Sequence, residues 1–73
     1  IQIARLQCLK KQSGAAAAIA ARWSATLGRE ITAAQVVLCL VDLKLARLAH
    51  DPAHEDSVVD VCGYAALLRE VTS

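Results

Sequence analysis

Apolar residues recur along this chain at the three- and four-residue spacing of helices, in four segments. The first segment ends near Gly14. The second runs from about residue 15 to residue 27, and Gly28 behind it is a natural C-terminal cap. Because glycine costs a helix interior only about 1 kcal/mol, the first two segments can also form one bent helix.

Capping boxes mark the start of the third and fourth segments. Thr32-Ala-Ala-Gln35 predicts a helix that runs to about Ala49, and Asp51-Pro52 then breaks the chain. Ser57-Val-Val-Asp60 predicts a last helix that runs to about Val71. The spacing of its apolar residues predicts an inward stripe made of Val58, Val61, Cys62, Ala65 and Leu68.

The third segment is apolar on two faces. One face carries Asp42, and the other carries Lys44 and Arg47. The apolar residues around Asp42 are Leu38, Cys39, Leu45, Ala46 and Ala49, and those around the two bases are Val36, Val37, Leu40 and Leu48. Such a helix is expected to be central and covered on both sides. A buried Asp42 then needs a partner, and we expect a basic residue of segment 1–29 across a subunit interface.

Composition supports an oligomer. Hydrophobic residues make up 56% of only 73 residues, which is more than one small domain can bury. Aromatic residues make up 3%, which argues against a sheet. We therefore predict a single all-α domain over residues 1–73, with three or four helices and a core completed by dimerisation.

Localisation and partners are also constrained. The apolar runs are too short for a membrane span, no secretory leader is recognisable, and the absence of Met suggests that residue 1 is a trimmed boundary. The three cysteines, Cys8, Cys39 and Cys62, are interpreted as reduced core residues of a cytoplasmic protein. Segment 1–29 carries five bases and no acid, and the remainder carries seven acids. The two halves can satisfy each other, so nucleic-acid binding is not favoured.

Four charged side chains are candidates for chemistry. Asp56 and Asp60 lie one turn apart and can either share a cation such as Mg²⁺ or favour the N-terminus of the last helix. Lys44 and Arg47 can extend to water, pair with those carboxylates, or hold a phosphate. His50 and His54 are interpreted as surface loop residues, with a transition-metal site as the alternative.

Several strings resemble a family of small phage and prophage proteins of unknown function. They are Ile19-Ala-Ala-Arg-Trp23-Ser-Ala-Thr-Leu-Gly28, Val41-Asp-Leu-Lys44-Leu-Ala-Arg47-Leu, and Pro52-Ala-His54-Glu-Asp56-Ser57-Val-Val-Asp60-Val-Cys-Gly63-Tyr64. The resemblance covers residues 15–72 and leaves residues 1–14, the predicted first helix, outside it.

That family is more faintly similar to the MazG-type all-α nucleoside triphosphate pyrophosphohydrolases. The similarity implies a MazG-like dimer and an Mg²⁺ site in which Asp60 matches the last acid of the second metal motif. Ser57 replaces a glutamate of that motif, and the first acidic motif is missing. We therefore expect a non-catalytic oligomer, without a cofactor, that binds a partner protein or a nucleotide. The alternative is an Mg²⁺-dependent pyrophosphohydrolase with Asp56 and Asp60 on the metal and Lys44 and Arg47 on phosphate.

Overall fold

The computed structural model describes residues 12–73, which form three helices and no strand. They are α2 (Ser13–Leu27), α3 (Ala33–His50) and α4 (Glu55–Thr72). The prediction of an all-α fold is confirmed for this part of the chain. The predicted first helix and Cys8 lie outside the described residues.

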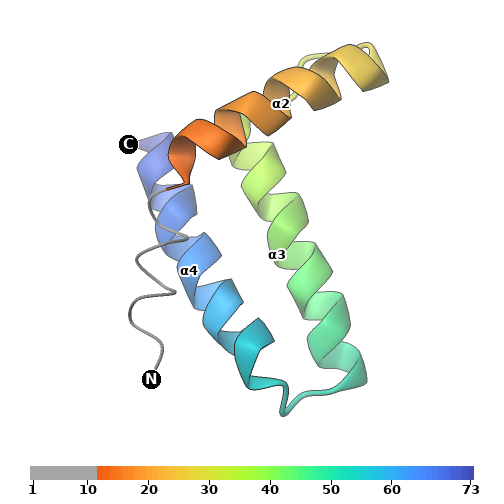
Figure 1. Ribbon diagram of the computed structural model, residues 1–73, viewed down its shortest axis with the longest axis vertical. Helices are drawn as coiled ribbons and strands as arrows, with labels where there is room; N and C mark the ends of the chain where they lie inside the picture. Colours follow the sequence, from red (N-terminus) through yellow and green to blue (C-terminus); the bar gives the residue numbers. More distant parts are fainter. Residues whose placement is uncertain (1–11) are drawn as a thin grey trace.

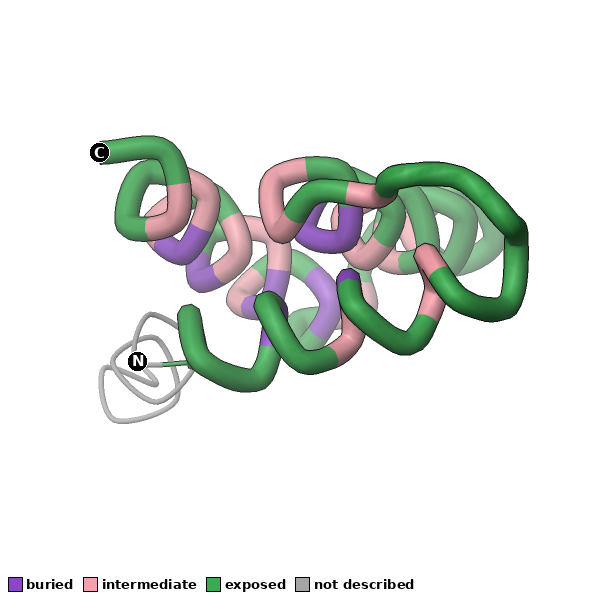
Figure 2. The backbone as a smooth tube through the Cα atoms, turned by 90° about the horizontal axis from the view of Figure 1, so that it is seen from above, coloured by how far each residue is buried: buried purple, intermediate pink, exposed green. Residues whose placement is uncertain are grey.

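Helices α3 and α4 form an antiparallel hairpin, and α2 crosses the end at which α3 begins and α4 ends (Figure 1). The packing between α3 and α4 is the most extensive, and α2 contacts α3 more than α4. Seen from above, α2 lies on one side of the hairpin (Figure 2). The core that these helices share is small: Ala16, Val37 and Leu67 are buried together, with Ala33, Tyr64, Leu68 and Val71 packed around them.

The local sequence explains where α2 ends and where α3 begins. Gly28 has φ 69°, the left-handed conformation that favours glycine, and its N–H donates to the Ser24 carbonyl at 3.0 Å. The Thr32 side chain then accepts from the Gln35 N–H at 3.1 Å, and the Gln35 side chain accepts from the Thr32 N–H at 2.9 Å. The capping box predicted at Thr32 is therefore confirmed.

A tight turn joins α3 to α4. The His54 N–H donates to the Asp51 carbonyl at 3.0 Å, and Pro52 occupies the second position of this four-residue turn, where its fixed φ is favourable. The turn holds the two long helices side by side in opposite directions. As a result, the C-terminal half of α3 lies against the N-terminal half of α4, where most of the candidate residues are located.

The predicted start of the last helix is wrong by three residues. Helix α4 begins at Glu55, and its N-cap is His54 rather than Ser57. Ser57 lies inside the first turn, where it is buried. The physical reason is the Pro52 turn, which closes at His54 and delivers the chain directly into the helix. Figure 1 shows this short connection at the end of the hairpin opposite α2.

Candidate functional site

Lys44 of α3 and Asp60 of α4 form an ion pair between the two helices of the hairpin. The Lys44 Nζ lies 3.0 Å from Asp60 Oδ2. The Asp60 side chain is only 2% exposed, and the Lys44 side chain is 26% exposed. This pairing was one of those predicted from the sequence, and the structure confirms it. Because the carboxylate is almost completely withdrawn from water, the ammonium is needed to offset its desolvation.

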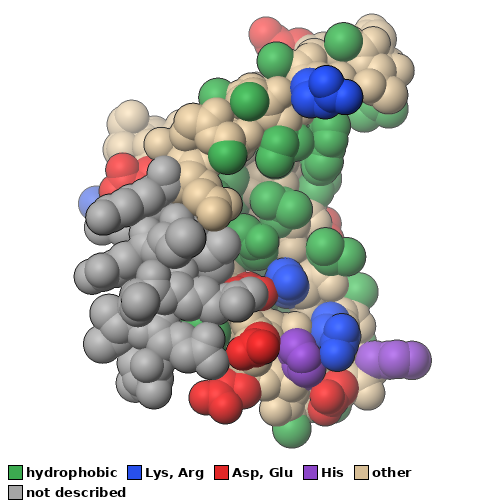
Figure 3. Space-filling view, in the orientation of Figure 1, with side chains coloured by type: hydrophobic (Ala, Val, Ile, Leu, Met, Phe, Trp, Pro, Cys, Tyr) green, Lys and Arg blue, Asp and Glu red, His purple; other side chains and the backbone are tan. Residues whose placement is uncertain are grey.

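Arg47 and Asp56 do not join this pair. Both side chains are exposed, and within residues 12–73 no carboxylate forms an ion pair with Arg47. Figure 3 shows the histidine and several charged side chains gathered near the connecting turn, hydrophobic side chains between them and α2, and further charged side chains on and beside α2. Of the two predicted phosphate ligands, Arg47 is open to solvent and Lys44 is engaged with Asp60.

The predicted metal ligands are a poor fit for Mg²⁺. Asp56 and Asp60 lie one turn apart on α4, but one is exposed and the other is buried against an ammonium group. Among the described side chains, no group of three or more His, Cys, Asp and Glu comes together in a way that could hold a metal ion. Mg²⁺ is often held by one or two carboxylates together with water and phosphate, but the Asp60 carboxylate is already paired with the Lys44 ammonium and withdrawn from solvent.

His54 has a structural role that the sequence interpretation missed. Its Nδ1 accepts from the Ser57 N–H at 3.2 Å and lies 2.7 Å from the Ser57 hydroxyl oxygen, whose hydrogen it can also accept. The ring therefore satisfies both a free N–H of the first turn and a buried hydroxyl group. The Pro52 turn, together with Glu55 and Asp56 in the first turn of the helix, was the signal for this start.

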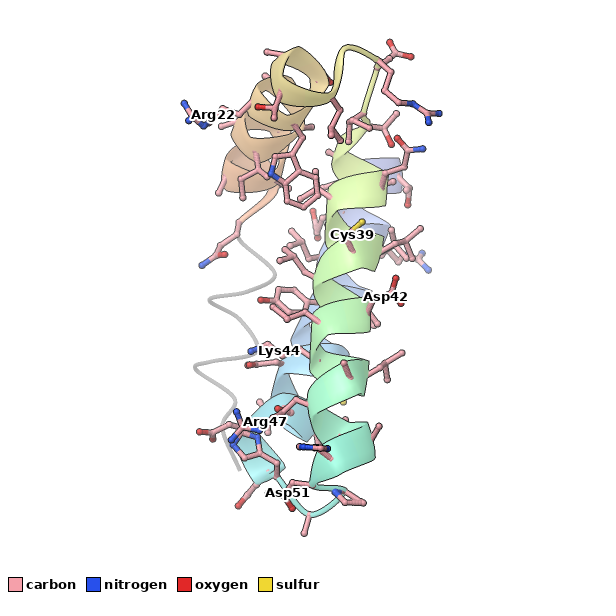
Figure 4. All side chains as sticks on the ribbon, turned by 90° about the vertical axis from the view of Figure 1, so that its right-hand side faces the viewer. Arg22, Cys39, Asp42, Lys44, Arg47 and Asp51 are labelled. Atoms are coloured by element: carbon pink, nitrogen blue, oxygen red, sulfur yellow. The ribbon has the colours of Figure 1, made fainter. Side chains whose placement is uncertain are left out.

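Asp42 is exposed in the single chain, so its burial and its partner across a subunit interface stay predictions. Figure 4 shows Asp42 and Lys44 on opposite sides of α3. The side that carries Lys44 faces α4, and no described helix covers the side that carries Asp42. The prediction of buried cysteines is also wrong for the two described ones, because Cys39 and Cys62 are exposed free thiols.

The predicted inward stripe of α4 is wrong as well. The buried residues of α4 are Ser57, Asp60, Gly63 and Leu67. Val58, Cys62 and Ala65 are exposed instead, and Val61 and Leu68 are half-buried. Leu68 packs against the core, but Val58, Cys62 and Ala65 of the predicted stripe lie outside the core of the single chain.

Two apolar stripes lie on the same side of the hairpin. In α3, Leu38 and Leu45 each follow an inward residue, Val37 or Lys44, by one position. In α4, Val61 and Leu68 follow the inward residues Asp60 and Leu67 in the same way. Each successive residue is turned by about 100° around the helix axis. In two antiparallel helices, the residue that follows each inward residue therefore lies on the same side of the hairpin in both helices. We call this surface the open face; it consists of Leu38, Leu45, Val58, Val61, Ala65 and Leu68.

The open face leaves large apolar side chains half exposed to water. Leu38 and Leu45 are each 49% exposed, and Val58 is 46% exposed. No described helix has the combination of length and hydropathy that a bilayer crossing requires. Isolated exposed leucines are common, but a contiguous apolar surface that joins two helices is typical of an interface.

Comparison with known proteins places the chain among phage proteins of unknown function. The model of a family described as a domain of unknown function, DUF6378, matches residues 3–72, which extends further toward the N-terminus than the resemblance over residues 15–72. The Gene 55 protein of Mycobacterium phage L5 is 39% identical over 54 residues, which are 73% of this chain. The chain spans about a third of that relative, 35% of its length. No solved structure matches the chain.

These matches support the predicted resemblance to phage proteins of unknown function. Neither description names an activity or a ligand. The family match covers nearly the whole chain, including all three described helices. The chain belongs to the DUF6378 family.

Proposed function

We propose that this chain is a non-catalytic, phage- or prophage-derived helical protein that self-associates and acts by binding a partner protein. The exposed apolar side chains carry this proposal. Leu27, Leu38, Leu43, Leu45 and Val58 are each between 46% and 61% exposed in the single chain. Covering part of this surface with a second copy would gain roughly 25 cal/mol for each Å² removed from water.

The polar residues support binding rather than catalysis. Asp60 and Lys44 stabilise the contact between α3 and α4, so neither is presented to a ligand as a nucleotide enzyme requires. A pyrophosphohydrolase must gather Mg²⁺ and phosphate charge in one place, and the described residues offer no cluster of three ligands. The proposal therefore includes a MazG-like arrangement of the helices but not the MazG-type pyrophosphohydrolase activity.

Nucleotide binding is the alternative within the same proposal. Arg47 is exposed on the outer part of α3, three residues from Lys44, and an unpaired guanidinium is a suitable phosphate ligand. The proposal also places the protein in the cytoplasm. In support of a reducing compartment, Cys39 and Cys62 are free thiols.

Two measurements test the proposal. Incubation with a panel of nucleoside triphosphates and Mg²⁺ should release no pyrophosphate. Release that disappears in a folded Asp60→Asn variant would establish the enzyme instead. Sedimentation equilibrium of the 73-residue chain at micromolar concentration should give a mass above the 7.7 kDa of one chain. A monomer at every concentration would remove the self-association.

For nucleotide binding, equilibrium dialysis with each triphosphate should be compared between the natural chain and Arg47→Met. Retention of nucleotide by the natural chain and its loss in the variant would favour the nucleotide alternative over a protein partner. Leu43→Met is the matched control, because it changes an exposed side chain on the same helix without altering charge.

A further inference from the structure

Helix α4 is capped by a histidine, a side chain that can change its charge near neutral pH. The His54 Nδ1 accepts from the Ser57 N–H at 3.2 Å and lies 2.7 Å from the Ser57 hydroxyl oxygen. The usual N-cap residues, Ser, Thr, Asp and Asn, offer an oxygen that stays an acceptor near neutral pH. Histidine changes its charge between about pH 5 and 8, so this cap depends on the protonation state of the ring.

Only the neutral ring can cap the helix in this geometry. A ring nitrogen that accepts from a backbone N–H carries a lone pair and no hydrogen, so the other ring nitrogen holds the proton. Protonation places a hydrogen on Nδ1 as well, and both nitrogens then donate. The Ser57 hydroxyl oxygen can accept that hydrogen, but the Ser57 N–H would face a second donor and would lose its acceptor.

Water cannot readily replace the acceptor that Ser57 would lose. Ser57 is only 1% exposed, and its N–H belongs to the first turn of α4, where the helix itself supplies no acceptor. A buried donor without a partner destabilises the folded state more than a donor that reaches water. The positive end of the helix also disfavours a charged ring at this position. Acidification should therefore open the first turn of α4.

Charged groups of both signs surround this end of the hairpin, and their effects on the ring oppose each other. Carboxylates favour a charged imidazole, whereas neighbouring bases disfavour it. The most buried of the acids, Asp60, is already paired with Lys44. The hydrogen bonds of the cap are therefore the contacts that distinguish the two forms of the ring. Within residues 12–73 the titratable and charged groups of this end are Lys44, Arg47 and His50 of α3, Asp51 of the turn, and Glu55, Asp56 and Asp60 of α4.

We infer that the start of α4 is a pH-sensitive device, in which protonation of His54 releases the first turn of the helix and loosens the adjoining end of the hairpin. Ser57 connects the cap to the hairpin, because it is the first buried residue of α4 and lies one turn before Asp60. Asp60 pairs with Lys44 of α3, so disorder at Ser57 reaches the contact between the two helices. This inference depends on contacts within one chain and is independent of the proposed self-association.

The variant His54→Asn separates the cap from its titration. An asparagine Oδ1 is bonded to Cγ, as the histidine Nδ1 is, so it can accept from the Ser57 N–H without being protonated. Urea-induced unfolding of both chains should be followed by circular dichroism at about pH 8 and about pH 5. On acidification, the unfolding equilibrium constant of the natural chain should rise about tenfold more than that of His54→Asn, because a cap is lost and a charge is placed at the positive helix end.

Hydrogen exchange supplies a local measurement. The protection factor of the Ser57 amide, which corrects for the intrinsic pH dependence of exchange, should fall on acidification in the natural chain and stay constant in His54→Asn. The matched control is His50→Asn, because His50 is the other histidine of the chain and is exposed at the end of α3. This control should retain the acid sensitivity of the natural chain.

Parallel pH profiles of the natural chain and His54→Asn would overturn the inference. A loss of acid sensitivity in His50→Asn as large as that in His54→Asn would also overturn it, since the cap would then not be the cause. If His54→Asn does not fold, His54→Ser takes its place, because serine is also an N-cap and does not titrate in this range. All chains are compared at one protein concentration, so that self-association does not enter the difference.

Discussion

The contact between α3 and α4 depends on a charge pair that a double-mutant cycle can measure. Asp60→Asn leaves the Lys44 ammonium without the carboxylate that lies 3.0 Å from it. Removal of one partner from a buried ion pair costs about 3–5 kcal/mol. Lys44 is 26% exposed and can turn its amino group toward water, so the expected loss is near the lower limit, about 3 kcal/mol.

The assay is urea-induced unfolding followed by circular dichroism, at one protein concentration because self-association would shift the apparent stability. Stability should be measured for Lys44→Met, Asp60→Asn and the double variant. We expect a coupling free energy of at least about 1 kcal/mol, because each single variant leaves a group whose partner is missing. In a domain of this size, each kcal/mol corresponds to about 4–8 °C in Tm.

Arg47 supplies the matched control for this cycle. It lies three residues from Lys44 on the same helix but forms no ion pair with Asp60. A cycle between Arg47→Met and Asp60→Asn should therefore be additive within about 0.5 kcal/mol. Additivity in the Lys44 cycle, or equal coupling in both cycles, would refute the reasoning that the buried pair holds the hairpin together.

Three further predictions concern the ends of the helices and the core. His54→Ala should cost about 1–2 kcal/mol in urea unfolding because the N-cap of α4 is lost, and His54→Asn should recover most of it; equal losses would contradict the cap. Gly28→Ala should cost about 1 kcal/mol, through the positive φ and not through crowding, so thermal unfolding should show no further loss for Gly28→Leu. Leu67→Ala should cost about 2–5 kcal/mol and Leu43→Ala less than about 0.5 kcal/mol, because Leu67 is fully buried and Leu43 is exposed; similar chemical-denaturation midpoints would show that the core is elsewhere.

Local sequence determined the helices and some of their ends. The apolar spacing and Gly28 predicted α2 to within two residues, and the Thr32–Gln35 box predicted the start of α3. These features depend on residues three or four apart, so their geometry is fixed within one turn of helix. The sequence also predicted that Lys44 of α3 could pair with an acidic residue of α4. In the structure that acidic residue is Asp60.

Only the tertiary structure decided which apolar surface is buried. Periodicity gave α3 two apolar faces, and packing covered the one that carries Val37 and Lys44 while leaving Leu38 and Asp42 exposed. In α4 the covered stripe contains Ser57 and Asp60 rather than the more apolar stripe of Val58 and Ala65. The period of a helix assigns residues to faces, but the choice of face depends on neighbours far away in sequence, here the Pro52 turn and the crossing of α2.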